Sequence, residues 1–373
     1  MLHNSSLKTW VEVSKKALEN NIQIIKRLAG NKLIMGVTKS NAYGHGLVAT
    51  SKLFVKYGVD WLGTDNLAEA VALRQAGIDA PILVLGYTPV RELDLAAQYK
   101  IKLTLYGEEI LATPSKFKSK INWHLKIDSG MSRQGVLVSH LPAFLSKLKN
   151  FPEIKIEGVL THFANADDLP GLVYARHQLV QFQTALDIFS THGFQTLIRH
   201  AAATPAFFSL PEAGFDLVRI GIGFYGLWPS AKFQESFKML GLQPVLQWKT
   251  RIVQIKTIKK NTPVGYGITE RVKKDSVIAV LPVGYYDGYF RGLSSIGRVL
   301  IGGQFCKILG RVSMNLCVAD ISAVRGAKVW NEVVLIGRSG NASITSEEIA
   351  QKLSTISYEV VARINPLLSR VYL

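Results

Sequence analysis

The chain has 373 residues, of which 48% are hydrophobic, and its formal net charge is +17 at pH 7. This length and apolar content argue against wholesale disorder and favour two domains, or one large barrel with an appendage. No apolar run reaches the roughly 18 residues that a membrane span needs, and Met1–Val11 lacks the apolar segment of a secretory signal. The only cysteines, Cys306 and Cys317, have no metal-type spacing. We therefore expect free thiols, a cytoplasmic location, no metal site and no membrane partner.

The positive charge is spread along the whole sequence. Lysines and arginines form no long basic block, and no RNA-binding signature accompanies them. A nucleic-acid-binding role would rest on net charge alone, so we rank it last and expect no nucleic-acid partner. We expect this solvated basic surface to attract anionic phosphates and carboxylates.

Between Lys32 and Gly221, short apolar runs alternate with amphipathic stretches. Helical patterns such as Leu47–Tyr57, Leu67–Ala76 and Val173–Ser190 separate most of the strand candidates. The predicted strands are Leu33–Thr38, Trp61–Thr64, Ile82–Leu85, Lys102–Leu105, Asn122–Ile127, Ile156–Thr161, Thr196–Arg199 and Phe215–Arg219. Alternation of this kind predicts parallel β/α units, and eight such units suit a closed TIM-like (β/α)8 barrel of the α/β class.

After Trp228, strand-like runs punctuated by Gly and Pro dominate, which predicts a mostly β-stranded C-terminal domain. The runs are Leu246–Ile258, Ser276–Leu281, Arg298–Ile301, Gln304–Gly310, Asn315–Asp320 and Glu332–Ile336. We assign residues 1–238 to the barrel and 239–373 to the second domain, with the boundary near Ser230–Gly241. The segment up to about residue 10 is a candidate for pairing with the second domain.

The strongest local signal lies in Val37–Gly46. Its Lys39 ends the first buried strand and precedes a turn rich in Gly. The carboxyl ends of strands line the active site of a β/α barrel, and a lysine desolvated there becomes nucleophilic toward an aldehyde. Tyr43, in the same loop, could hydrogen-bond an anionic group. A lone lysine after a strand is more often an ordinary surface residue, and it is the flanking sequence that favours a cofactor site.

Thr38–Gly46 resembles the cofactor-lysine motif of the bacterial alanine racemases, usually Lys-Ala-Asn-Ala-Tyr-Gly-His-Gly, with Ser40 in second place. Further similar motifs follow in order: Lys126–Met131 with Arg133, Thr161–Ala164, Val218–Gly226, Val264–Gly267, Gly284–Gly288, Gly310–Met314 and Tyr358–Val360. Their order and spacing together are specific, and they cover essentially the whole chain. The resemblance is to pyridoxal-phosphate-dependent racemases of barrel-type fold III, whose β/α barrel precedes a β-stranded domain.

This resemblance implies an isomerase that interconverts L- and D-alanine through an external aldimine of pyridoxal 5'-phosphate and supplies D-alanine for peptidoglycan. Lys39 holds the cofactor. Lys39 and Tyr266 are then the two acid/base groups on opposite faces of the flat carbanion. A free tyrosine has a pKa of about 10 and needs help to act as a base. By resemblance, His162 links Tyr266 to Arg219, and Tyr266 comes from the partner subunit of a homodimer with shared active sites.

Arg219, at the end of the last barrel strand, faces the pyridine nitrogen of the cofactor by resemblance. An arginine remains a hydrogen-bond donor, so it keeps that nitrogen unprotonated and weakens the ring as an electron sink. A weaker sink favours prompt reprotonation at Cα over transamination, whereas many other pyridoxal enzymes place a carboxylate at this nitrogen.

The cofactor phosphate requires donors. Gly221 and Ile222 follow the last strand, and we expect them to open a short helix whose amides suit a phosphate. Hydroxyls of Tyr43, Thr204 and Tyr358 are further cofactor-binding candidates. The family usually has Asn-Ser where this chain has Ala203-Thr204, so we expect phosphate binding with altered local support.

The resemblance also implies substrate-binding residues. Arg133 would contact the cofactor's ring oxygen and the substrate carboxylate. Lys126 matches a lysine that is often carbamylated in the family, and a carbamate there would turn the repulsion between Lys126 and Arg133 into an attraction. A plain lysine that points elsewhere is the open alternative. The backbone amide of Met314 would meet the substrate carboxylate. Asn315 follows it where Asp is usual, which removes a negative charge near the site.

Tyr285, Arg291 and Arg311 match residues that line the family's access channel, although surface arginines and loop tyrosines are the ordinary alternative. Tyr358 narrows the pocket and favours a methyl side chain. Asn315 and Ala203 keep open a racemase of broader or serine-type specificity. A fold III decarboxylase of basic amino acids is less favoured, because those enzymes are longer. A pyridoxal-phosphate carrier protein would lack Tyr266 and the second domain.

Overall fold

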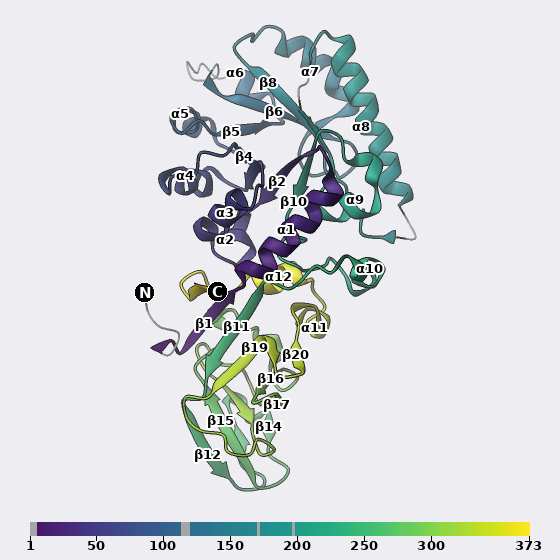
Figure 1. The fold of residues 1–373 in the computed structure, drawn as a ribbon. Coiled ribbons are helices and arrows are strands. Elements are labelled where there is room, and N and C mark those ends of the chain that lie inside the picture. The colour runs from purple at the N-terminus through teal and green to yellow at the C-terminus, as the bar shows by residue number, and fades with distance from the viewer. Residues whose placement is uncertain (1–5, 113–119, 170–171, 196–197) are drawn as a thin grey trace.

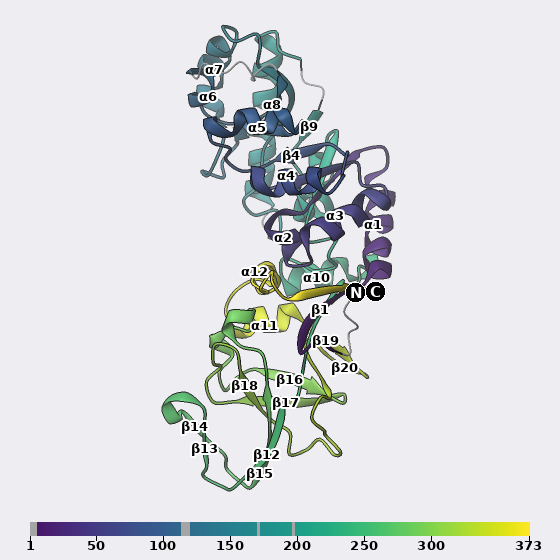
Figure 2. The same ribbon diagram turned by 90° about the vertical axis from the view of Figure 1, so that its left-hand side faces the viewer.

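The computed structural model describes residues 6–112, 120–169, 172–195 and 198–373. The molecule is elongated, with an α/β barrel at one end and a β-rich part at the other (Figures 1 and 2). The predicted fold class, a barrel followed by a mostly β-stranded C-terminal domain, is confirmed.

Eight parallel strands within the described residues form the barrel, in the order β10-β2-β3-β4-β5-β6-β8-β9. They are β2 (Leu33–Val37), β3 (Trp61–Thr64), β4 (Ile82–Val84), β5 (Lys102–Leu105), β6 (Asn122–Asp128), β8 (Lys155–Leu160), β9 (Ile198–His200) and β10 (Leu217–Ile220); the short β7 (Val136–Leu137) pairs with β6. The bridge between Ala203 and Arg219 and a hydrogen bond from the Arg219 amide to Ala202 O (2.9 Å) bring the two ends of the sheet together. Of the predicted strand Thr196–Arg199, the first two residues lie outside the described residues.

Helices cover the outside of this sheet (Figure 1). They bury one apolar face each, as α1 does with Leu18, Ile22 and Ile25 behind its Ser14 N-cap. The helices of this part are α1 (Lys15–Ala29), α2 (Lys39–Tyr43), α3 (Leu47–Lys56), α4 (Leu67–Gln75), α5 (Leu93–Gln98), α6 (Glu109–Ala112), α7 (Leu141–Leu148), α8 (Val173–Thr191), α9 (Thr204–Ser209) and α10 (Ala231–Phe237). No helix of the described residues is long and apolar enough to cross a membrane.

The second sheet has the order β12-β15-β18-β17-β16-β19-β11-β1-β21 in the described residues. Its strands are β1 (Thr9–Val13), β11 (Leu246–Arg251), β12 (Gln254–Ile258), β15 (Ser276–Leu281), β16 (Arg298–Ile301), β17 (Gln304–Leu309), β18 (Cys317–Asp320), β19 (Glu332–Ser339) and β21 (Ser369–Tyr372), with β20 (Ala342–Ile344) beside β19 and a separate pair β13 (Pro263–Val264) and β14 (Glu270–Arg271). The expectation of one run over Leu246–Ile258 was wrong, since the backbone leaves the strand at Ile252–Val253 and β12 pairs with β15 instead. Sequence analysis also missed α11 (Ser346–Lys352) and α12 (Ser357–Ala362).

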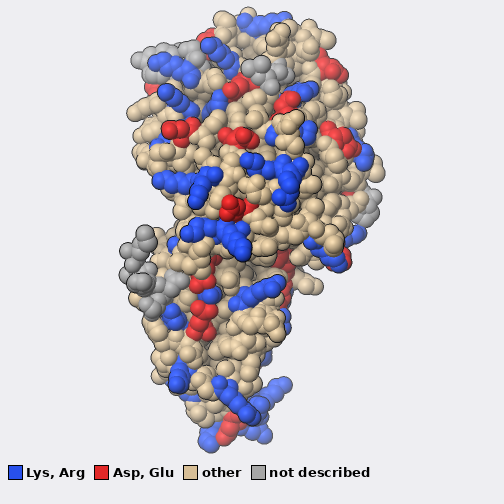
Figure 3. Space-filling model, viewed as in Figure 1, with Lys and Arg blue, Asp and Glu red and all other residues tan. Residues whose placement is uncertain are grey.

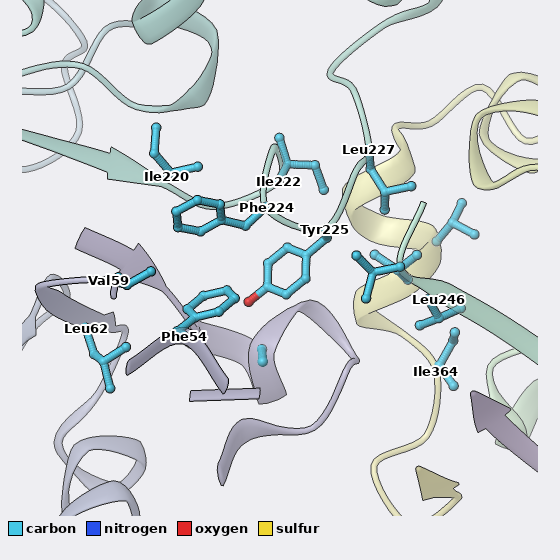
Figure 4. Close-up of a cluster of buried hydrophobic side chains, with 14 of the residues drawn as sticks. Phe54, Val59, Leu62, Ile220, Ile222, Phe224, Tyr225, Leu227, Leu246 and Ile364 are labelled. Carbon is cyan, nitrogen blue, oxygen red and sulfur yellow. The ribbon is translucent and has the colours of Figure 1, made fainter. Parts of the chain in front are cut away.

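The two parts share their junction. Strand β1 pairs antiparallel with β11 and parallel with β21, so both ends of the chain join the second sheet. Above it, Phe54 packs edge-on against Phe224 with 5.0 Å between ring centroids, and Tyr225 lies beside them (Figure 4). Lys and Arg side chains are interspersed with Asp and Glu on the face drawn in Figure 3.

Asn21, which is fully buried on α1, ties this junction together. Its side-chain amide donates to Phe224 O (3.1 Å) and Gln243 O (2.8 Å), and its Oδ1 accepts from the Gln243 amide (2.8 Å). Asn21→Ala leaves these backbone groups unpaired, and we expect it to lower the free energy of unfolding by about 2–4 kcal/mol. Urea denaturation measures the loss. The control is Asn20→Ala, because the Asn20 side chain makes only longer hydrogen bonds, to Asn21 Oδ1 (3.4 Å) and Gly241 O (3.2 Å). Equal free energies of unfolding for the two variants would contradict this account.

Candidate active site

A cavity of about 870 Å³ lies at the carboxyl ends of the barrel strands. It is lined by ten of the residues singled out from the sequence: Lys39, Tyr43, Lys126, Arg133, His162, Thr204, Arg219, Gly221, Ile222 and Tyr358. These residues come from segments up to 319 positions apart, between Lys39 and Tyr358. The cavity is therefore where a β/α barrel is expected to place its active site.

Lys39 opens an unusual turn. The four residues after it, Ser40–Tyr43, all have left-handed backbone angles, with φ between 52° and 56°. This conformation is costly for residues with a Cβ. The turn is held by Glu69, whose carboxylate accepts from the amides of Asn41 (3.1 Å) and Asp65 (3.2 Å). It thereby fixes the backbone that carries Lys39.

The second sheet supports the same turn from outside. The Tyr372 hydroxyl donates to His45 O (2.6 Å), and Arg370 Nε donates to Gly44 O (3.1 Å). A Cβ on Gly44, where φ is 83°, would lie 2.1 Å from Val361 O of α12. The position of Lys39 thus depends on β21 and α12 as well as on the barrel.

Lys39 Nζ lies 3.7 Å from the carboxylate of Asp65, and both side chains are partly exposed. Asp65 follows β3 directly, and Lys39 lies two residues after the end of β2. The rule that strand ends carry functional residues would have singled it out, but sequence analysis missed it. The carboxylate offers the lysine an ion-pair partner at the cavity wall.

Arg219 is almost fully buried beneath the cavity. Its Nη1 donates to His200 O (2.8 Å) and His200 Nδ1 (3.0 Å), and its Nη2 donates to Thr161 O (2.7 Å) and Ala201 O (2.8 Å). His162 Nδ1 also lies 3.3 Å from Nη2. Among the described residues, the Nε–H has no acceptor. Burial lowers the pKa of Arg219 to about 10, so the guanidinium remains charged at neutral pH and has one N–H to offer to a ligand.

Lys126 and Arg133 bring two more cationic groups to the cavity. Burial, followed by the charges of Arg219, Arg133 and Lys39, lowers the pKa of Lys126 to about 8. Its Nζ donates to Gln134 Oε1 at 3.3 Å, a partner that sequence analysis missed. Near neutral pH a measurable fraction of this lysine is therefore an uncharged, nucleophilic amine.

The start of α9 and the turn after β10 form a polar corner. Thr204 Oγ1 accepts from the amides of Gly221 (3.1 Å) and Gly223 (3.4 Å), so the Gly221 amide already has a partner. A Cβ at Gly221 would lie 2.5 Å from the Tyr43 hydroxyl. Ala203 is the N-cap of α9 and has no side chain to cap it, whereas the usual Asn would.

The phenol groups of Tyr43 and Tyr358 face this corner with ring centroids 6.1 Å apart. Burial raises the pKa of both. Both therefore remain protonated donors at neutral pH.

Known proteins resemble this chain over its whole length. Family profiles described as the N-terminal and C-terminal domains of alanine racemase match residues 13–229 and 245–372. The alanine racemase of Syntrophobacter fumaroxidans is 40% identical over 95% of this chain and 95% of its own length, and that of Leptospira interrogans is 36% identical over 97% and 95%. The chain belongs to the alanine racemase family.

Solved structures of this family have the same fold. The alanine racemase of Bacillus anthracis with bound L-Ala-P is 34% identical and has a TM-score of 0.93, with 98% of this chain and 95% of that chain covered. The alanine racemase of E. faecalis is 29% identical and has a TM-score of 0.90, with 100% of both chains covered.

The remaining predicted residues of this racemase-family chain do not line the cavity. Tyr266 lies on the second domain and is 72% exposed. Both glycines that flank Tyr266 lie close to Arg311: a Cβ on Gly265 would be 3.4 Å from the Arg311 amide nitrogen, and one on Gly267 would be 2.9 Å from Arg311 Nη1. The Tyr285 and Tyr286 amides donate to Ser313 O and Met314 O. We call the set Tyr266, Tyr285, Tyr286, Arg311 and Met314 the exposed aromatic face. Asn315 is exposed next to it, and Arg291 begins a short 3₁₀ turn nearby in sequence.

A buried histidine next to the turn after Lys39 makes the free energy of unfolding depend on pH. His45 is fully buried and its Nδ1–H donates to Ala42 O (3.1 Å) and Tyr43 O (3.0 Å). Burial lowers its pKa to about 4, and these bonds offset only part of that effect. Below pH 6.5 the unfolded chain gains a proton at this residue while the folded chain does not. Stability is therefore lost as the pH falls from 6.5 towards 4, by about 1.4 kcal/mol per pH unit for one proton.

We expect His45→Gln to flatten the pH dependence of the free energy of unfolding by about one proton in this window. Denaturant titrations at several pH values measure it. The change His140→Gln, at an exposed histidine, is the control, and an unchanged slope in the His45 variant would contradict the assignment.

Proposed function

We propose that this chain is an alanine racemase that interconverts L- and D-alanine with pyridoxal 5'-phosphate bound at Lys39. The observation that carries the proposal is that Lys39 and the buried Arg219 line the same cavity, and that the Arg219 Nε–H has no acceptor among the described residues. The family membership supports the same reaction.

The residues of the cavity fit this cofactor. Lys39 would form the imine with its aldehyde, and the Arg219 Nε–H would meet its pyridine nitrogen. The Tyr43 and Tyr358 phenols, the Thr204 hydroxyl and the Ile222 amide would hold its phosphate. When bound, the cofactor supplies an electron-withdrawing ring that makes the α-proton of the amino acid acidic.

Racemisation then requires a proton donor and acceptor on each face of the substrate. Lys39 would serve one face. His162 Nδ1 accepts from the cationic Arg219, so a neutral His162 carries its proton on Nε2. Burial and then the charge of Arg219 lower the pKa of His162, which keeps it neutral. We propose that this Nε2–H stabilises the phenolate of Tyr266 on the opposite face.

Tyr266 would come from a second copy of the chain. In its own chain it is absent from the cavity and exposed, together with the aromatic and apolar side chains of the exposed aromatic face. Exposed Tyr and Met side chains in one patch are typical of an interface. The proposed assembly is therefore a homodimer in which each subunit completes the other's site.

For Lys126 we propose reaction with carbon dioxide. The neutral amine attacks carbon dioxide, a proton leaves, and an N-carboxylate forms. This change replaces a cation by an anion beside Arg133, which would then hold the substrate carboxylate without repulsion. A cytoplasmic location and supply of D-alanine for peptidoglycan belong to the same proposal.

Complementation tests the shared site. We expect Lys39→Ala and Tyr266→Phe each to reduce D-alanine formation from L-alanine by at least about a hundredfold, because each lacks one acid/base group. When the two inactive variants are unfolded, mixed and refolded, roughly half of the dimers are mixed, and each has one intact site. Activity should return to about one quarter of wild type.

No recovery on mixing would show that each site is built within one chain. Normal racemisation by Tyr266→Phe in both directions would exclude the two-base mechanism. Turnover of L-serine and L-lysine, compared with L-alanine, measures the substrate preference.

Carbamylation is tested by ¹³C NMR with labelled bicarbonate. We expect a carbamate carbon that disappears in Lys126→Met and persists in the control Lys15→Met, at an exposed lysine. Because the neutral amine reacts, the signal should weaken as the pH falls below the Lys126 pKa of about 8. A spectrum without a carbamate carbon at pH 8 would leave Lys126 as a plain lysine.

A further inference from the structure

A continuous polar chain runs from Arg219 through the inside of the barrel. Arg219 Nη1 lies 3.0 Å from His200 Nδ1, His200 Nε2 lies 2.8 Å from His124 Nδ1, and His124 Nε2 lies 3.4 Å from Glu157 Oε2. Lys102 Nζ closes the far end with bonds of 2.7 and 2.6 Å to the Glu157 carboxylate. We call these five residues the barrel relay.

The donors and acceptors of the relay have only one consistent arrangement. A guanidinium can only donate, so His200 Nδ1 must accept and the His200 proton is on Nε2. That proton is donated to His124 Nδ1, which places the His124 proton on Nε2, where it is donated to Glu157. Every bond therefore points from Arg219 towards the carboxylate, and both imidazoles are neutral.

Burial agrees with this arrangement. His124 and His200 are fully buried, and burial lowers the pKa of both, with Arg219 acting in the same direction. Burial would raise the pKa of Glu157, but the bonds from His124 and Lys102 outweigh it and lower this pKa to about 2. The relay thus has a cation at each end and a carboxylate next to Lys102.

The backbone is shaped to accommodate the relay. Trp123 pairs with Ile156 and His124 with Gly158, so Glu157 is the extra residue of a bulge between β6 and β8. Bulges re-aim a side chain, and they are rare between parallel strands. A Cβ on Gly158 would lie 2.5 Å from His124 Nδ1, so only glycine leaves room for the ring.

Apolar side chains also lie among the barrel strands. Met35, Trp61, Leu83 and Leu217 form a separate buried cluster, as is usual inside such barrels. Trp61 of this cluster borders the barrel relay, with its ring centroid 5.1 Å from Lys102 Nζ and 5.5 Å from the centroid of the His124 ring. Burying polar groups is costly unless every donor and acceptor is paired. We take the complete pairing of the barrel relay as a sign that it has a function.

We propose that Glu157, fixed by Lys102 at the far end of the barrel, is a positioning residue for the racemase reaction: through the tautomers of His124 and His200 it holds the Arg219 guanidinium with its Nε–H towards the cofactor nitrogen. This inference rests on the proposed function. The carboxylate makes His200 Nδ1 a better acceptor, because hydrogen bonds in a chain polarise one another. Arg219 Nη1 is then held by His200 Nδ1 and His200 O, and the Arg219 Nε–H would remain for the ring nitrogen.

The decisive variant is Glu157→Gln. An amide can donate to His124 Nε2, which allows both imidazoles to reverse and presents a proton on His200 Nδ1 to Arg219. The matched control is Glu12→Gln. Glu12 is a buried carboxylate that also accepts from a lysine, Lys249 (2.9 Å), and from a ring N–H, that of Trp10 (2.9 Å), but in the second sheet.

The first measurement is ¹⁵N NMR of histidine-labelled protein without cofactor. In wild type we expect Nε2-protonated, neutral rings for His124 and His200, with a ¹⁵N–¹⁵N coupling across the bond between them. In Glu157→Gln we expect Nδ1-protonated forms of both rings to appear and the coupling to weaken. Glu12→Gln should keep the wild-type pattern.

The second measurement is made on the holoenzyme. In Glu157→Gln we expect a shifted absorbance maximum of the bound cofactor and a kcat reduced roughly tenfold with little change in KM, as is usual when an orienting residue is lost. Lys102→Met should shift the absorbance in the same direction. Glu12→Gln should leave absorbance, kcat and KM unchanged.

A proton on Nδ1 of either ring in wild type would overturn the proposal, and this outcome needs no variant to fold. A wild-type cofactor spectrum in both Glu157→Gln and Lys102→Met would also overturn it. Failure of the wild-type chain to bind pyridoxal phosphate or to racemise alanine would instead refute the proposed function, while the NMR pattern would still decide the tautomers.

Discussion

The buried guanidinium of Arg219 needs hydrogen-bond acceptors for its N–H groups, and the rest of the structure depends on this constraint. A guanidinium removed from water costs several kcal/mol unless its N–H groups are paired. Here the carbonyls of Thr161, His200 and Ala201 accept four bonds together with the His200 ring. These carbonyls lie at the ends of β8 and β9, so the barrel must close in register to satisfy them. The same closure forms the wall of the cavity.

A second constraint is the left-handed turn that carries Lys39. Four residues with positive φ do not hold this conformation by themselves, and their support comes from Glu69 and from β21 and α12 at the other end of the chain. The second domain therefore supports Lys39, the proposed cofactor lysine, of its own chain. In the proposed dimer it would also cover the cavity of its partner, so that one domain serves two sites with two different surfaces.

The sequence predicted the barrel, because apolar strands alternate with amphipathic helices, and it singled out Lys39 and Arg219, which the structure places at one cavity near the ends of β2 and β10. It could not show the relay. His124 and Glu157 are separated along the chain and meet only because a bulge turns Glu157 into the barrel, and no local pattern predicts that bulge. For Tyr266 only the resemblance implied a place in a site, because the position that we propose for it depends on a second chain.

The charges of the cavity connect these features. Lys39, Lys126, Arg133 and Arg219 line one space, and in the described residues Asp65 is the only carboxylate that forms an ion pair with any of them. Burial, and then the charges of Arg219, Arg133 and Lys39, lowers the pKa of Lys126. Each ligand that we propose for this space, a phosphate, a substrate carboxylate or a carbamate, brings the missing negative charge. The excess of cations that line the cavity thus favours anionic ligands, while Arg219 is also paired with the barrel relay through His200.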